Sequence, residues 1–282
     1  MGTDNYYSVK EDVQKYIDGC KTKMNVRTHK VFGRAILAGM MIAFGASASN
    51  VAAHAVTNVG LSRLVAGCVF PVGLMMVVLL GAELFTGDCL MAMGNAEGTC
   101  TILDLIKFLF VVYVGNFVGS IFLAVINVIS GQLNYSSGLL GAYTIKVAMG
   151  KVNMSFGQAL SSGILCNILV CAAVLMAMCA RDIVGKLFAC FFTIMLFVVA
   201  GYEHCVANMY YIPAGLIAAR NQNYVQIAMD TYGYTADQLA SLNLYGFFVK
   251  NLVPVTLGNI IGGAVLGLIL LYLHGYDKKK AA

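Results

Sequence analysis

Six long apolar runs dominate this sequence of 282 residues, and they restrict the possible fold more than any other feature. A helix that crosses a bilayer needs about 20 mainly apolar residues. Only 11% of the residues are charged and 60% are hydrophobic, whereas a soluble domain carries roughly 25% charged residues. We therefore expect an all-α membrane protein with six transmembrane helices. The runs cover approximately residues 33–56, 64–95, 103–131, 156–180, 184–219 and 246–273.

Basic residues predict how these spans are oriented. With the N-terminus inside, seven Lys/Arg residues before residue 35, three in the inner loops and three near the C-terminus give 13 on the cytoplasmic side, against five outside. Cytoplasmic loops are enriched in Lys and Arg, so we expect both termini in the cytoplasm of a multi-pass protein of the cell inner or plasma membrane. The predicted organisation is an amphipathic cytoplasmic segment over 1–32, a channel domain over 33–275 and a cytoplasmic tail over 276–282. The net charge of +5 is thus a topology signal, and we expect no nucleic-acid partner.

The two halves of the chain repeat each other. Gly81-Ala-Glu-Leu-Phe-Thr-Gly-Asp-Cys-Leu-Met91 in the second run has a counterpart in Gly201-Tyr-Glu-His-Cys-Val-Ala-Asn-Met209 in the fifth, and Gly-Asn-x-x-Gly follows each motif, at 115–119 and 258–262. Each half (33–131 and 156–273) has three spans, an odd number, so the repeat must be inverted in the membrane. Paired interrupted helices in such repeats indicate a substrate path near the middle of the membrane.

The interruptions also carry polar side chains at a depth where they are costly. Glu203 and His204 are ionisable groups inside an apolar run, and such groups usually face a cavity or a partner and mark a pathway. Thr86 is compatible with a pore role and equally with a simple kink in which its hydroxyl bonds a carbonyl one turn back. The Gly-Asn-x-x-Gly segments are typical of close helix packing, which we favour over ligand contact.

Three separated motifs resemble the formate/nitrite transporter family in the right order. They are Gly81-Ala-Glu-Leu-Phe-Thr86, Gly201-Tyr-Glu-His-Cys-Val-Ala-Asn-Met209 and Pro254-Val-Thr-Leu-Gly-Asn-Ile-Ile-Gly-Gly263. The resemblance implies an aquaporin-like inverted repeat (3+3) with broken helices 2 and 5. It also implies a homopentamer with one anion pore through each protomer.

The resemblance further implies roles for individual residues, matched position by position. The pore and substrate residues would be Thr86, His204, Asn167, Leu84 and Phe85, with apolar constrictions at Leu74, Phe70 and Phe197 and an external cation at Lys151. We interpret Glu83 and Glu203 as structural supports whose carboxylates accept hydrogen bonds from unwound backbone N–H groups. Asp88 stands where some formate channels carry a small hydroxyl residue, and it either faces the cytoplasmic vestibule or packs away from it.

A mechanism must deal with the cost of moving an anion through an apolar constriction. His204 can supply a proton or a fixed donor, so that small monovalent weak-acid anions such as formate, nitrite or hydrosulfide cross as the neutral acid. A proton-coupled secondary transporter of the same anions fits the same residues, and an aquaporin-like neutral solute channel fits less well because Asn-Pro-Ala motifs are missing. The sequence contains no metal-ligand cluster or nucleophile–base pair, so we expect neither an enzyme nor a cofactor or metal, and the expected partners are anions, lipid and further copies of the chain.

Overall fold

The structure is a computed structural model that describes residues 5–275, so the expected tail over 276–282 lies outside the described part. Within that part the chain is helical, apart from a single antiparallel bridge between Tyr6 and Ala180. The elements are α1 (Val9–Met24), α2 (Thr28–Ala53), α3 (Val59–Val69), α4 (Val72–Leu79), α5 (Phe85–Asp88), η1 (Cys89–Met91), α6 (Ala92–Ala96), α7 (Ile102–Ile129), η2 (Gln132–Gly138), α8 (Leu139–Val152), α9 (Phe156–Cys179), α10 (Ile183–Ala200), α11 (Cys205–Ala218), α12 (Gln222–Tyr232), α13 (Ala236–Leu239), η3 (Gly246–Leu252) and α14 (Val253–His274).

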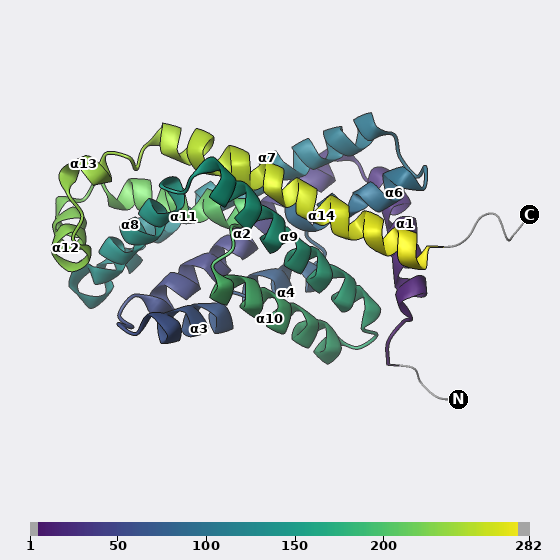
Figure 1. Cartoon of the computed structure of the whole chain (residues 1–282), viewed down its shortest axis with the longest axis horizontal. Helices are drawn as coiled ribbons and strands as arrows, with labels where there is room; N and C mark the ends of the chain where they lie inside the picture. Colours follow the sequence, from purple (N-terminus) through teal and green to yellow (C-terminus); the bar gives the residue numbers. More distant parts are fainter. Residues whose placement is uncertain (1–4, 276–282) are drawn as a thin grey trace, which may run out of the picture.

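Six helical segments are long and apolar enough to cross a membrane, which confirms the expected fold class. They are α2, α3 with α4, α7, α9, α10, and η3 with α14. The helices run roughly along the long axis of the bundle (Figure 1), with α1 and α6 at one end and α8, α12 and α13 at the other. The C-terminal end of α14 lies at the same end as α1, as an even number of spans requires.

The second and fifth membrane spans are broken, as predicted. After α4 the chain turns at Gly81 (φ +64°) and resumes in α5 at Phe85, and after α10 it turns at Gly201 (φ +76°) and resumes in α11 at Cys205. Both turns need a left-handed backbone conformation, which glycine adopts without steric cost. The unwound residues therefore occupy equivalent positions in the two repeats.

Close helix pairs hold each repeat together. Helix α7 packs along α2, and α14 packs along α9. A Cβ atom at Gly119 would overlap the carbonyl oxygen of Ile36, and one at Gly262 would overlap that of Ile164. These glycines belong to the two Gly-Asn-x-x-Gly segments, so the packing interpretation of these segments is confirmed.

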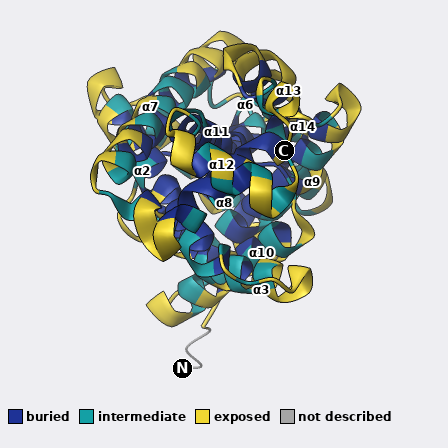
Figure 2. Ribbon diagram, turned by 90° about the vertical axis from the view of Figure 1, so that its left-hand side faces the viewer, coloured by how far each residue is buried: buried dark blue, intermediate teal, exposed yellow. Residues whose placement is uncertain are grey.

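Helix α1 begins with a capping box in which Ser8 and Glu11 satisfy each other's backbone N–H groups. The buried side of α1 faces the bundle and contacts α6, α9 and α14. It carries Val13, Tyr16 and Ile17. Its apolar face is therefore covered by the protein itself. The outer surfaces of the spans are different: Figure 2 shows buried residues inside the bundle and exposed residues around its rim. Many exposed residues there are large and apolar, as on α10 and α14, and suit lipid or another membrane-embedded chain.

Candidate functional site at the two broken helices

Two asparagines hold the unwound backbone in place. The Oδ1 atom of Asn116 accepts from the N–H of Phe85 at 2.9 Å, while its Nδ2 donates to the carbonyl oxygens of Glu83 (2.9 Å) and Ala35 (2.7 Å). Irregular backbone at this depth must be satisfied by protein or water, because lipid offers no hydrogen bonds. Asn116 is fully buried and provides these hydrogen bonds to the backbone of the first break.

Asn259 repeats the arrangement in the second half. Its Oδ1 accepts from the N–H of Cys205 at 2.9 Å, and its Nδ2 donates to the carbonyl oxygens of Glu203 (3.0 Å) and Gly163 (2.8 Å). Neither asparagine was among the residues predicted for the site. The signal was present, since each is the Asn of a Gly-Asn-x-x-Gly segment that follows a break.

The breaks bring Thr86 and His204 together. Thr86 Oγ1 lies 2.8 Å from His204 Nε2, and both residues are buried. His204 Nδ1 accepts from the N–H of Ala207 at 3.0 Å, so in a neutral imidazole the proton sits on Nε2, which then donates to Thr86. The hydroxyl proton of Thr86 is left to point toward another acceptor. A second ring proton on Nδ1 would face the Ala207 N–H, so this geometry favours the neutral ring.

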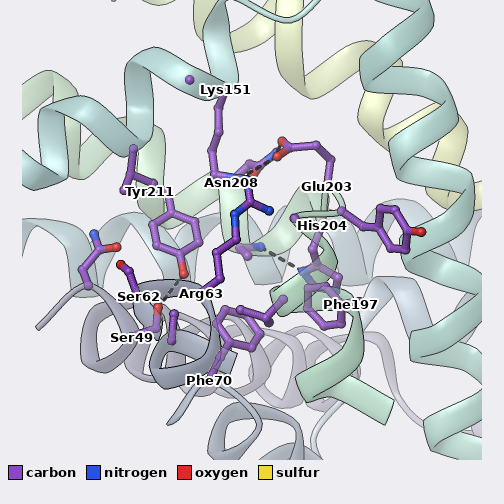
Figure 3. A pocket seen from close by; sticks show the side chains of 18 of the residues that line it. Ser49, Ser62, Arg63, Phe70, Lys151, Phe197, Glu203, His204, Asn208 and Tyr211 are labelled. Atoms are coloured by element: carbon purple, nitrogen blue, oxygen red, sulfur yellow. Dashed lines mark hydrogen bonds and ion pairs between the residues drawn. The ribbon is translucent and has the colours of Figure 1, made fainter. Parts of the chain in front are cut away.

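Two phenylalanines lie beside this pair. The Phe197 ring stacks on His204 with centroids 5.9 Å apart, and Phe70 meets Phe197 edge-on at 5.5 Å. Both rings line a cavity of about 290 Å³ that reaches His204 (Figure 3). Leu74 and Leu84 are buried on the neighbouring elements, Leu74 in α4 and Leu84 at the start of α5. Phe70 and Phe197 thus lie beside the polar pair, and Leu84 is two residues before Thr86 in the chain.

The same cavity carries cations. Lys151, in the last turn of α8, places its Nζ 2.8 Å from Glu203 Oε1. Glu203 Oε2 accepts from the side-chain amides of Asn208 (2.7 Å) and Asn251 (3.2 Å). Arg63 also lines the cavity, and it was not predicted.

A second group of charges lies where α1 meets the first break. Lys23 Nζ pairs with Glu83 Oε2 at 2.6 Å and also with Asp88, while Arg34 approaches Glu83 at 3.7 Å. Burial lowers the pKa of Lys23, but its ion pairs with Asp88 and Glu83 outweigh that effect and raise the pKa above its usual value. Tyr16 of α1 also donates to the carbonyl oxygen of Gly87 at 3.3 Å. Asp88 is therefore buried against α1.

The structure corrects three expectations. The Glu83 and Glu203 carboxylates accept from lysine and asparagine side chains, and the unwound N–H groups of Phe85 and Cys205 go to Asn116 and Asn259, as described above. The reason is geometric, because an asparagine amide can accept from one side of a break and donate to the other.

The other two corrections concern Phe85 and Asn167. The Phe85 ring packs edge-on against Tyr113 at 4.8 Å and lines a groove between α7 and α14, and it is not among the residues that line the cavity at His204. Both Nδ2 bonds of Asn167 go to carbonyl oxygens, those of Thr86 (3.0 Å) and Asn259 (2.6 Å). Asn167 thus ties the start of α5 to α14 and has no amide hydrogen left to offer an anion.

Comparison with known proteins decides the family. The family model described as Formate/nitrite transporter matches residues 10–273. The chain belongs to the formate/nitrite transporter family. It is 42% identical over 257 residues to a protein of Haemophilus influenzae named formate channel FocA, with 89% of each chain covered, and 34% identical to the formate channel FocA of Escherichia coli K12, with 88% of each covered.

Solved structures of the formate/nitrite transporter family give the same fold. One described as a pentameric formate channel with formate bound has a TM-score of 0.80 at 34% identity, covering 87% of this chain and 96% of that one. Another, described as an FNT family ion channel, has a TM-score of 0.79 at 25% identity, covering 93% and 98%. The inverted repeat with two broken helices is therefore the family fold.

Proposed function

We propose that this protein is a channel for small monovalent weak-acid anions, with formate, nitrite and hydrosulfide as the candidates. The observation that carries the proposal is the contact between Thr86 and His204, at 2.8 Å, where the two broken helices meet. Relatives named as formate channels and a pentameric neighbour with formate bound support the substrate class and a homopentamer, with one pore in each protomer.

Each part of the proposed path reduces the cost of dehydrating an anion. Lys151 and Arg63 raise the local concentration of anions at the outer mouth. Phe70, Phe197 and Leu84 exclude water near the centre, where a bare charge is most costly. There the Thr86 hydroxyl donates to the anion while His204 Nε2 donates to Thr86, so with a neutral ring the pair is a fixed donor. Net proton transfer needs a ring that has also taken a proton from water at Nδ1. Nε2 then passes its proton to Thr86, Thr86 passes its own proton to the anion, and a neutral ring remains while the substrate crosses as the neutral acid.

Flux into proteoliposomes tests the proposal. Formate, nitrite, hydrosulfide, acetate and lactate are compared from about pH 5 to 7.5, around the reference histidine pKa, at matched anion concentration. Thr86→Val deletes the hydroxyl donor and should lower flux at every pH, whereas His204→Asn keeps a hydrogen-bonding side chain and should flatten the pH profile. A detergent-corrected mass of five protomers checks that each variant still assembles.

The outcomes separate the alternatives. Anion flux that follows the electrochemical gradient of the anion alone supports the channel, and flux with a fixed proton stoichiometry supports a secondary transporter instead. Flux of neutral solutes without anions would indicate an aquaporin-like function. A wild-type pH profile in His204→Asn would leave His204 as a structural hydrogen-bonding residue.

A further inference from the structure

The two ends of the broken helices carry equivalent ion pairs. Glu83 and Glu203 are the third residues of the two repeated motifs. Each forms an ion pair with a lysine, and the two lysines come from two different helices. Lys23 of α1 approaches Glu83 at 2.6 Å, and Lys151 of α8 approaches Glu203 at 2.8 Å. Each break therefore has the same Lys–Glu ion pair at its mouth.

The repeats diverge at Asp88 and Asn208, which stand at the same place after their glutamates. Asn208 is neutral and donates its amide to Glu203 Oε2 at 2.7 Å. Asp88 cannot make that contact as a carboxylate, and its Oδ1 contacts Lys23 instead. Its Oδ2 atom is buried and has no hydrogen-bond partner within residues 5–275.

This exchange makes the charges at the two mouths unequal. When Asp88 is ionised, two cations around Glu83, Lys23 and Arg34, meet two carboxylates. Around Glu203 two cations line the outer cavity with a single carboxylate. The phenol of Tyr16 and the thiol of Cys171 donate to the carbonyl oxygens of Gly87 and Thr86 beside Asp88, and as protonated donors they add no charge. Among residues 5–275, the outer mouth therefore keeps one more positive charge around its glutamate than the inner mouth.

We propose that Asp88 sets the difference between the two sides of the pore, so that anions are captured more weakly from the cytoplasmic side than from outside. The inference rests on the proposed anion channel function and on its orientation. A cleft with surplus charge concentrates ions of opposite sign, and partly buried charges are screened less by salt than exposed ones. Asp88 cancels that surplus at the inner mouth by holding Lys23, whereas in the described part of the chain Lys151 is paired with Glu203 alone.

Uptake of labelled formate into right-side-out and inside-out membrane vesicles tests this proposal, since the anion enters from the outer face in one and from the inner face in the other. Wild-type protein should need more formate for half-saturation in inside-out vesicles. Asp88→Asn should lower that inner-face value by roughly three- to ten-fold, and leave the outer-face value unchanged. The introduced amide can donate to Glu83 as Asn208 does to Glu203, so the fold has a template for the change.

Two further variants keep the test decisive. Asp88→Ser removes the charge without adding an amide, and it should shift the inner-face value in the same direction. Asp18→Asn removes an equal charge from an exposed position of α1, and it should shift neither value. If wild-type vesicles of both kinds take up formate but Asp88→Asn and Asp88→Ser match Asp18→Asn, the role of Asp88 is wrong and the channel function stands. If wild-type vesicles of neither kind take up formate, the proposed function fails first.

Discussion

At the scale of single residues, the decisive feature is that both ring nitrogens of His204 have a defined partner. His204 Nδ1 is occupied by the Ala207 N–H, and its Nε2 faces Thr86. One hydrogen of the pair, that of the Thr86 hydroxyl, is therefore free to meet a substrate. The chemistry of the centre thus depends on the backbone of α11 as much as on the imidazole.

The apolar residues beside this pair give a prediction about size selectivity. Phe197→Ala and Leu84→Ala should raise flux and admit larger anions such as lactate, because each removes bulk next to Thr86 and His204. The measurement is the flux of the anion panel into proteoliposomes, with protein stability followed in parallel.

Leu140→Ala is the matched control, because Leu140 is equally buried but lies in α8, among core residues. It should cost about 2–5 kcal/mol of stability, as expected for a truncated core leucine, without any gain in flux. Unchanged flux with lost stability in Phe197→Ala and Leu84→Ala would place those two side chains in the core instead.

Sequence patterns predicted the residues at the centre of the site but not the residues that hold them in place. Thr86 and His204 were found because polar residues interrupt apolar runs, which is a local signal. The direction of the Phe85 side chain and the use of both Asn167 hydrogens depend on which helices pack around them, and no local pattern reports that. Lys23 was missed because it lies on α1, whose docking against the first break is a long-range contact.

At the scale of elements, the two breaks depend on one asparagine each. Asn116→Ala and Asn259→Ala should each destabilise the protein by about 1–3 kcal/mol, because they leave a buried backbone N–H and a carbonyl without partners. Flux should fall in both, since α5 and α11 would lose their fixed starting points. Thermal unfolding and anion flux measure the two effects.

Asn127→Ala is the control for this prediction. Asn127 lies on α7 like Asn116, but it donates to the hydroxyls of Ser47 and Tyr210, away from the breaks. It should affect stability only. An equal loss of flux in Asn127→Ala would mean that flux reports general damage to α7, and the special role of Asn116 would be lost.

Helix α1 gives a prediction about pH. Burial raises the pKa of Asp12 from an ordinary value near 3.8 to about 6, although Lys15 and Lys186 oppose the shift. The docked helix therefore holds a proton that the undocked helix releases, so docking is strongest below about pH 4 and weakens as the pH rises through 6. Hydrogen exchange of residues 9–24, corrected for intrinsic rates, should show decreasing protection over that range.

Asp12→Asn removes the titration and should make protection of α1 independent of pH in the same window. Asp18→Asn, on the exposed side of the helix, should keep the wild-type dependence. If Asp12→Asn also keeps it, another group controls the docking of α1.

At the scale of the whole molecule, the inverted repeat places equivalent breaks at the centre and different helices at the two ends. Helices α1 and α6 lie at one end, and α8, α12 and α13 at the other (Figure 1). Of the basic residues, those before residue 35, with Lys107, Arg181 and Lys186, belong to the end that carries α1, and the positive-inside rule assigns that end to the cytoplasm.

Cysteine labelling in intact cells tests this orientation. In a background without the exposed Cys68, Thr22→Cys on α1 should resist a membrane-impermeant maleimide in intact cells and react in inside-out vesicles. Asp237→Cys on α13 should behave in the opposite way. Both positions are exposed, so a difference between them reports the side of the membrane and not burial. Reaction of Thr22→Cys from outside intact cells would invert the protein, and the more anion-attracting mouth around Glu203 would then face the cytoplasm.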